Sequence, residues 1–128
     1  MNEKQAISTT DAPAALGPYS QAIIAGKLVF ASGQLGLIPQ SGQLIGETVA
    51  AQVEQALKNL QAVLEAAGSS LAKVVKTTVF LENMDDFAKM NEIYARWFPE
   101  PFPARSCVAV KTLPRGAKVE IEAIALLF

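Results

Sequence analysis

The chain has 128 residues, 51% hydrophobic and 18% charged, which supplies one core and predicts a single domain over residues 1–128. Its formal net charge of −1 gives no general attraction to nucleic acid or to anionic lipid. With no histidine and one cysteine, the chain lacks the commonest general base and cannot form an internal disulfide or a multi-thiolate metal site.

Three short strands are predicted at the start of the chain. Ala6–Ile7 and Gln21–Ile24 favour strands on either side of a proline-containing loop. A third strand begins at Leu28–Ala31. Gly26 is suited to the first central position of a type II′ turn, so the second and third strands are expected to pair antiparallel.

Two amphipathic helices are predicted, with a fourth strand between them. Apolar residues recur at three- and four-residue steps over Thr48–Ala67, and Gly68 is suited to end that helix. The β-branched and aromatic residues of Val74–Leu81 favour a strand. A second helix is expected between Asn83, which can cap it, and Pro99, which cannot continue it. Its apolar stripe consists of Phe87, Met90, Tyr94, Trp97 and Phe98.

Two further strands, Ala104–Val110 and Lys118–Leu126, complete the order β-β-β-α-β-α-β-β. This order is typical of an α+β fold, in which two helices cover one face of a sheet. Small and apolar residues occupy both sides of the last two strands, so the other face is expected to be buried as well. We therefore predict a homo-oligomer whose partner subunits cover the face that the helices leave open.

One fixed cation and one carboxylate interrupt these apolar strands, Arg105 in the first and Glu120 in the second. Burying either charge is costly unless it finds a partner, which ligand sites and subunit interfaces usually provide. Strand alternation places Glu120 on the side away from the helices. We expect Arg105 to join it there if the last two strands pair in suitable register.

Together these two side chains would form a site for a small carboxylic acid attacked by water. A guanidinium can hold a carboxylate bidentately, and a nearby carboxylate can orient and partly deprotonate a water. Spacing alone leaves open the alternative that Arg105 and Glu120 simply pair with each other at a subunit interface. Cys107, in the same strand as Arg105, is a small core residue in the commoner interpretation.

Several segments of the chain also match a known family pattern. They are Ala15–Gln21, Ala31–Gln34, Gln55–Asn59, Val75–Val79, Asp86-Phe87 with Asn91, Phe102–Cys107 and Val119–Ile124. Over nearly its whole length the chain resembles the RidA proteins (reactive intermediate deaminase A, of the YjgF-type superfamily). The resemblance implies a chorismate-mutase-like α+β fold with a mixed β-sheet, assembled as a homotrimer with sites at the subunit interfaces. It also implies hydrolysis of 2-iminobutanoate and 2-iminopropanoate to 2-oxo acids and ammonia, without a cofactor.

The resemblance further implies roles for individual residues. Arg105 would grip the substrate carboxylate, and Glu120 would position the attacking water and move protons. The main chain at Cys107, with Gly33 nearby, would contact the imine end. The residues that would shape the pocket and hydrogen-bond within it are Tyr19, Ser32 and Asn91.

Two other functions stay open on sequence grounds. The same pocket would serve a non-catalytic trimer that binds or senses small 2-oxo acids or other carboxylic acids. A stress-linked chaperone role has no sequence signature, and the acidic balance and absent histidine disfavour RNA cleavage. The start of the chain lacks the apolar segment of a secretory signal, and with a free thiol this predicts a cytoplasmic protein.

Overall fold

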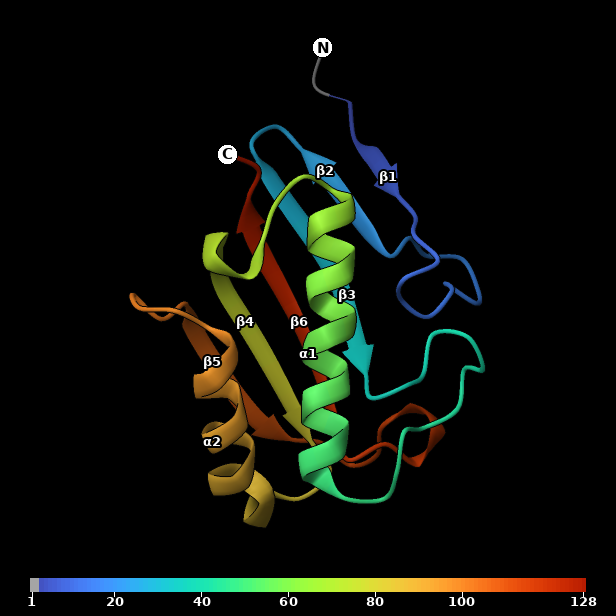
Figure 1. The fold of residues 1–128 in the computed structure, drawn as a ribbon, viewed down its shortest axis with the longest axis vertical. Coiled ribbons are helices and arrows are strands. Elements are labelled where there is room, and N and C mark those ends of the chain that lie inside the picture. The colour runs from blue at the N-terminus through green and yellow to red at the C-terminus, as the bar shows by residue number, and fades with distance from the viewer. Residues whose placement is uncertain (1–2) are drawn as a thin grey trace.

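The computed structural model describes residues 3–128, and a six-stranded sheet forms its centre (Figure 1). The strands are β1 (Gln5–Ile7), β2 (Ala22–Ala25), β3 (Leu28–Leu35), β4 (Val74–Leu81), β5 (Ala104–Ala109) and β6 (Val119–Leu126). They lie in the order β1-β2-β3-β6-β4-β5. All six predicted strands are therefore confirmed, and β3 extends beyond its predicted end.

The connections between strands explain this order. Gly26 has a φ of 61° in the two-residue turn that joins β2 to β3, and the predicted antiparallel hairpin is confirmed. Helix α2 (Phe87–Trp97) carries the chain back along the sheet, so β5 runs parallel to β4. All other neighbours pair antiparallel. As a result β5 is an edge strand, and β4 separates it from β6.

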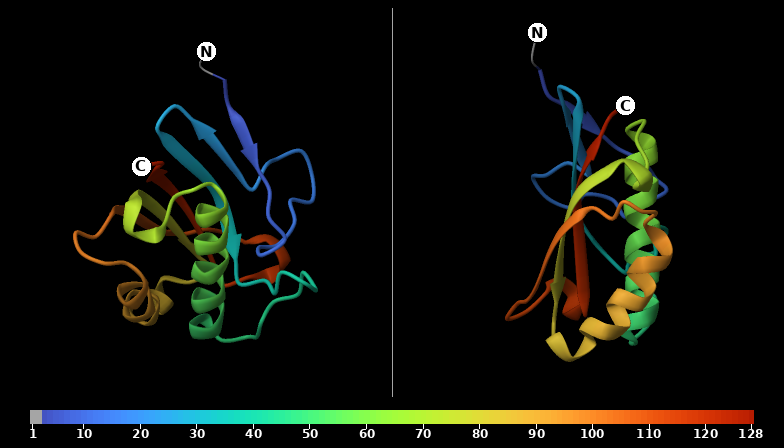
Figure 2. Two further views of the ribbon diagram at one scale, coloured as in Figure 1. Left: turned by 45° about the horizontal axis from the view of Figure 1, so that its top comes forward. Right: turned by 90° about the vertical axis from the view of Figure 1, so that its left-hand side faces the viewer.

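Two helices, α1 (Val49–Ala66) and α2, lie on the same face of the sheet (Figure 2), which confirms the predicted α+β arrangement. The Thr48 hydroxyl caps α1 by accepting a hydrogen bond from the Ala51 N–H at 3.1 Å. Gly68 follows α1 with a φ of 89°, the left-handed conformation expected of a terminator.

The start of the second helix differs from the prediction. Asn83 accepts a hydrogen bond from the Asp85 N–H at 2.8 Å, but this caps a short 3₁₀ turn over Met84–Asp86. Helix α2 itself begins at Phe87, directly after that turn. The prediction gave the right capping residue but the wrong kind of helix after it. An Asn side chain can accept hydrogen bonds from the first N–H groups of an α-helix or of a 3₁₀ helix.

The core lies between the sheet and the helices. Val53, Leu57, Leu60 and Leu64 of α1 are fully buried against it. The sheet contributes alternate residues, and on β6 these are Val119, Ile121, Ala123 and Ala125. Since the side chains of a strand alternate, Glu120 and Glu122 point to the opposite face, as predicted.

The face opposite the helices is partly apolar in the single chain. Phe30 of β3, Val108 of β5 and Leu126 of β6 expose between 42% and 46% of their surface there. A group of exposed apolar side chains on one face is typical of a protein interaction surface. No helix among residues 3–128 is long and apolar enough to cross a membrane, and the cytoplasmic location stays a prediction.

Candidate functional site

Arg105 and Glu120 lie on opposite faces of the sheet, so the prediction that they share one face is wrong. Arg105 is the register partner of Thr77 on β4, which is fully buried under the helices. Glu120 is the partner of Phe80 on β4, on the other face. Register partners point to the same side of a sheet, and consecutive residues point to opposite sides. The sheet therefore separates the Arg105 guanidinium from the Glu120 carboxylate within one chain.

The physical reason for this error is the position of β5. The prediction required β5 and β6 to be neighbours, whereas the helical crossover places β5 beyond β4. The alternative that Arg105 and Glu120 pair with each other at a subunit interface stays a prediction, because it concerns two chains. Neither residue takes part in an ion pair with any other residue in the range 3–128.

Three residues of α2 surround the Arg105 guanidinium. Its Nη1 donates a hydrogen bond to Asn91 Oδ1 at 2.7 Å. The guanidinium carbon lies 5.5 Å from the Phe87 ring centroid and 4.9 Å from the Tyr94 ring centroid. These three residues stand at positions i, i+4 and i+7 of one helix, so they share one face of it. The cation thus has aromatic and amide neighbours, and within residues 3–128 it has no anion.

A cavity of about 420 Å³ opens beside Arg105. Its lining consists of Asn91, Tyr94, Ala95, Phe102, Pro103 and Arg105. This volume suits a small molecule, and Arg105 contributes the one charge of the lining. An apolar cavity with a single fork-shaped cation can take a small carboxylic acid with an apolar side chain.

Cys107 lies on the same face of β5 as Arg105, two residues further along the strand. The thiol packs against the core, and burial raises its pKa more than the nearby Arg105 lowers it. A protonated thiol is a poor nucleophile. The Cys107 thiol is therefore not an activated nucleophile, and its main chain is the candidate for contact with a ligand.

Glu120 forms the second part of the candidate site, on the open face. Its carboxylate is half-buried, and this burial raises the pKa of Glu120, with a smaller contribution from the negative charge of Glu122. Its cross-strand partners, Leu35 on β3 and Phe80 on β4, do not titrate. A carboxylate with a raised pKa is a better proton acceptor when ionised than an ordinary exposed one.

Gly33 provides the space for the Glu120 side chain. β3 has a bulge between Ala31 and Gln34, where its register with β6 shifts. A Cβ atom at Gly33 would lie 2.7 Å from the Glu120 carboxyl carbon and 2.9 Å from its Cγ. Only glycine therefore admits the carboxylate in this position. The structure brings Gly33 and Glu120 together. It does not place Gly33 near Cys107 within one chain, contrary to the prediction, because β6 and β4 separate β3 from β5.

Ser32 lies at the bulge of β3, next to Gly33, and Tyr19 lies in the loop that leads into β2. The Ser32 hydroxyl donates to the Ser20 carbonyl at 2.6 Å, and the Ser32 N–H donates to the Gln21 carbonyl at 2.9 Å. These bonds fix the end of the loop that carries Tyr19, whose side chain is exposed. Ser32 thus has a structural role in the single chain, and Tyr19 is free to meet a ligand or another subunit.

The predicted site residues therefore lie in two separate groups, which we call candidate half-sites. The first, on the helix side, consists of Arg105, Asn91 and Cys107. The second, on the open face and the adjoining loop, consists of Glu120, Gly33, Ser32 and Tyr19. Phe87 and Tyr94 were predicted as core residues of the second helix, and their contacts with Arg105 were missed. The spacing that places them on one face of α2 is the same for a core stripe and for a binding face.

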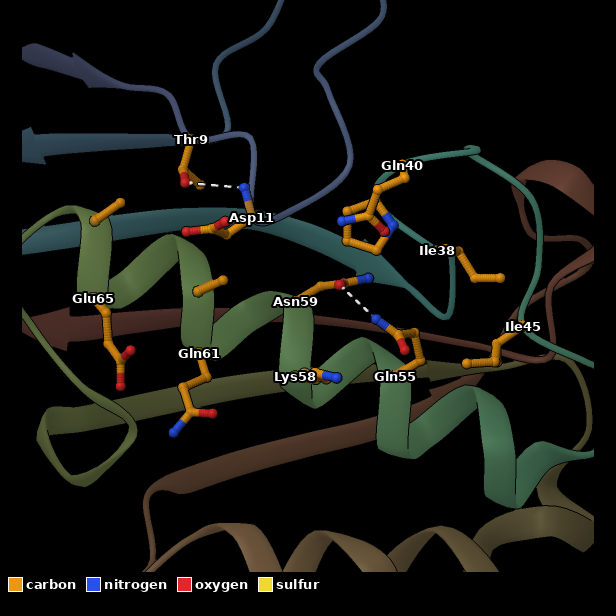
Figure 3. Close-up of a pocket in the computed structure, with 13 residues that line it drawn as sticks. Thr9, Asp11, Ile38, Gln40, Ile45, Gln55, Lys58, Asn59, Gln61 and Glu65 are labelled. Carbon is orange, nitrogen blue, oxygen red and sulfur yellow. Dashed lines mark hydrogen bonds between the residues drawn. The ribbon is translucent and has the colours of Figure 1, made fainter.

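A second cavity, of about 770 Å³, lies between α1 and the loops that follow β1 and β3 (Figure 3). Its lining includes none of the predicted site residues. Its buried amides already have partners. Gln55 Nε2 donates to Asn59 Oδ1 at 2.8 Å, and Asn59 Nδ2 donates to the carbonyls of Leu35 and Leu37. These bonds hold the loop after β3 against the helix. Residues 3–128 bring together no group of His, Cys, Asp or Glu side chains that could hold a metal ion.

Known proteins resemble this chain in both sequence and fold. Residues 9–127 match the model of the family described as Endoribonuclease L-PSP. The chloroplastic Reactive Intermediate Deaminase A of Arabidopsis thaliana is 55% identical over 98% of this chain and 67% of its own. The 2-iminobutanoate/2-iminopropanoate deaminase of Mus musculus is 53% identical over 96% of this chain and 91% of its own. The crystal structure of E. coli TdcF with bound serine matches with a TM-score of 0.91 and 43% identity, over 95% of this chain and 98% of that one.

Proposed function

This chain belongs to the Endoribonuclease L-PSP family, and from that premise we propose that it hydrolyses 2-iminobutanoate and 2-iminopropanoate to 2-oxo acids and ammonia. Relatives named for that activity match it over nearly its whole length. The observation that carries the proposal is the Arg105 guanidinium, which has no anion within residues 3–128 and lines a cavity of about 420 Å³. Both substrates are small acids whose carboxylate suits this cation.

We propose further that the protein assembles as a homotrimer of chorismate-mutase-like subunits. The two half-sites lie on opposite sides of the sheet, so one chain cannot bring Arg105 and Glu120 to the same substrate. A ring of three subunits would place the Arg105 half-site of each against the Glu120 half-site of the next. The exposed Phe30, Val108 and Leu126 would then be covered at the interfaces.

The chemistry follows from these positions. Arg105 holds the substrate carboxylate with its guanidinium fork, and this fixes the imine carbon relative to Glu120 of the neighbouring subunit. Glu120 accepts a proton from a water as the water oxygen bonds to the imine carbon, and it passes this proton to the imine nitrogen, which gives a neutral carbinolamine. Glu120 then accepts the proton of the carbinolamine hydroxyl as C=O forms and returns it to the nitrogen, which leaves as ammonia when the C–N bond breaks. The product is the 2-oxo acid, and no step calls for a cofactor.

The main chain at Cys107 and the residues Tyr19, Ser32 and Asn91 complete the proposed site. Asn91 already accepts a hydrogen bond from Arg105, so it supports the carboxylate end. Tyr19 is exposed near Ser32, so it supports the imine end at the edge of the second half-site. The main chain of Cys107 is proposed to contact the imine.

A coupled assay tests this function directly. A threonine dehydratase releases 2-iminobutanoate from threonine, and the formation of 2-oxobutanoate is followed with and without the purified protein. We expect the protein to accelerate the formation of the oxo acid. A protein that only bound or sensed 2-oxo acids would leave the rate unchanged, and that result would contradict the proposal.

Gly33→Ala is expected to reduce activity by at least about tenfold, because the added methyl group displaces the Glu120 carboxylate from its position against β3. The fold should persist, since the φ of Gly33 lies outside the left-handed region. Gly46→Ala is the matched control, because its new Cβ would meet only the Ala51 Cβ at 3.9 Å. The measurement is the initial rate of Gly33→Ala and of Gly46→Ala in the coupled assay. Equal activity of the two variants would show that Glu120 does not need this position.

Glu122→Gln is expected to move the acidic limb of the pH–activity profile to lower pH. The reaction needs ionised Glu120, so activity falls as pH drops through the raised pKa of that carboxyl. Removing the negative charge of Glu122 lowers the pKa of Glu120, although its burial still holds that pKa above the ordinary value. The measurement is kcat/KM against pH for both proteins. A limb that stays in place, or moves to higher pH, would contradict the assignment of Glu120 as the base.

A further inference from the structure

We propose that Tyr94, Thr77 and Phe87 are positioning residues that hold the Arg105 guanidinium in the orientation that the substrate carboxylate requires. This inference rests on the proposed function, in which Arg105 binds that carboxylate. None of the three is expected to touch the reacting atoms. They act through Arg105, by limiting the directions in which its donors can point.

The contacts form a continuous chain from the core to the cation. Thr77 and Arg105 lie side by side as register partners on β4 and β5. Thr77 is fully buried, and its hydroxyl shares a hydrogen bond of 2.7 Å with the hydroxyl of Tyr94, which is 4% exposed. The Tyr94 ring in turn lies 4.9 Å from the guanidinium carbon. A buried hydroxyl pair thus fixes the tilt of an aromatic ring that contacts the site cation.

Aromatic contacts and one hydrogen bond together restrict the guanidinium. The ring of Phe87 lies 5.5 Å from the guanidinium carbon, so two aromatic groups contact the planar cation. Asn91 Oδ1 accepts a hydrogen bond from Nη1, and this bond sets which edge of the guanidinium plane faces α2. The donors of Nη2 and Nε have no hydrogen-bond partner in the part of the chain that the structure describes. These remaining donors are available for a bidentate carboxylate.

The benefit of such restraint is a smaller loss of freedom on binding. A free arginine side chain samples many rotamers, and a ligand that immobilises it must offset that lost entropy. An arginine side chain that is already held loses less conformational entropy when the carboxylate binds. Burial raises the pKa of Tyr94 despite the opposing effects of Thr77 and Arg105, so the phenol keeps its proton and its bond to Thr77.

Tyr94 also belongs to the hydrophobic core, and this suggests a matched control. The Tyr94 and Phe98 rings lie 4.4 Å apart, and both side chains are almost fully buried. Phe98 does not contact the Arg105 guanidinium among the described aromatic contacts. Phe98→Leu therefore removes a similar amount of core packing without removing a ring from the cation, whereas Tyr94→Leu removes both.

We expect Tyr94→Leu to raise KM for the imino acid about tenfold and to weaken binding of 2-oxobutanoate by a similar factor, with a much smaller effect on kcat. Phe98→Leu should lower the melting temperature without changing either constant. Tyr94→Phe keeps the ring and loses only the bond to Thr77, so we expect an increase in KM of about threefold. The measurements are steady-state kinetics, calorimetry with 2-oxobutanoate and thermal denaturation.

The mobility of the Arg105 guanidinium can also be measured without catalysis. Nitrogen-15 NMR of the arginine side chains, with Arg105 assigned from its absence in Arg105→Ala, reports how freely the guanidinium rotates. Slow rotation in the wild type and fast rotation in Tyr94→Leu would support the inference. Equal rotation in both proteins, or an equal rise in KM for Phe98→Leu, would overturn it. Full activity of Arg105→Ala would instead overturn the proposed function and leave the NMR result standing.

Discussion

Arg105→Ala is expected to lower kcat/KM in the coupled dehydratase assay by at least about a hundredfold, close to complete loss of the acceleration. The guanidinium is the one charge in the lining of its cavity, so its removal leaves the substrate carboxylate without a partner. Without that anchor the imine carbon is no longer held against the base. The loss should appear in both KM and kcat, because the carboxylate contact both binds and orients the substrate.

Arg105→Lys separates the charge from the shape of the cation. Lysine keeps one positive charge but loses the planar fork, the donor to Asn91 and the surface that contacts Phe87 and Tyr94. We expect a loss of at least about tenfold, well below wild-type activity. Arg96→Ala is the matched control, because this exposed arginine of α2 pairs only with Glu92. Full activity of Arg105→Ala would refute the mechanism.

The fold could be predicted from the sequence because local signals decided each element. The three- and four-residue spacing of α1, the Thr48 cap and the left-handed Gly68 all agree with one another. The strand β4 was predicted with the observed bounds, since Val, Thr and Phe are the residues that strands favour. At the start of α2 the sequence predicted the cap at Asn83 but not the 3₁₀ turn, because the same cap serves both.

The face of Arg105 could not be predicted from local signals. Alternation within β5 correctly placed Arg105 and Cys107 on one side, but which side depends on how the strand is placed next to β4. That placement depends on the crossover through α2 and on contacts between residues far apart in the sequence. The assumption that strands adjacent in sequence are paired is usually correct and failed here.

The contacts of Phe87 and Tyr94 with Arg105 were missed for a related reason. An aromatic residue on the inner face of an amphipathic helix is expected to fill the core, and Tyr94 does so as well as contacting the cation. Sequence spacing cannot separate these two uses when one side chain serves both. The contact with the cation is known only from the structure, which places Arg105 on the edge strand β5, next to the Tyr94 ring.

Glu120→Gln is expected to reduce kcat by about a hundredfold or more, with a smaller change in KM. The amide has the shape of the carboxylate but cannot accept the proton of the attacking water. Glu122→Gln, two residues along the same strand, is the matched control, and near its own pH optimum it should retain most of its activity. A Glu120→Gln variant with wild-type kcat would contradict the role of this residue as the base.

Mixing the two inactive variants tests whether the site is shared between chains. Each proposed site takes Arg105 from one subunit and Glu120 from the next, because one chain holds them on opposite faces. Equal amounts of Arg105→Ala and Glu120→Gln subunits, dissociated and reassembled together, would form about a quarter of their sites from two intact halves. We therefore expect recovery of about a quarter of wild-type activity, measured after exchange and normalised to total protein. If one chain supplied both groups, every site would lack one of them, and the mixture would stay as inactive as its components.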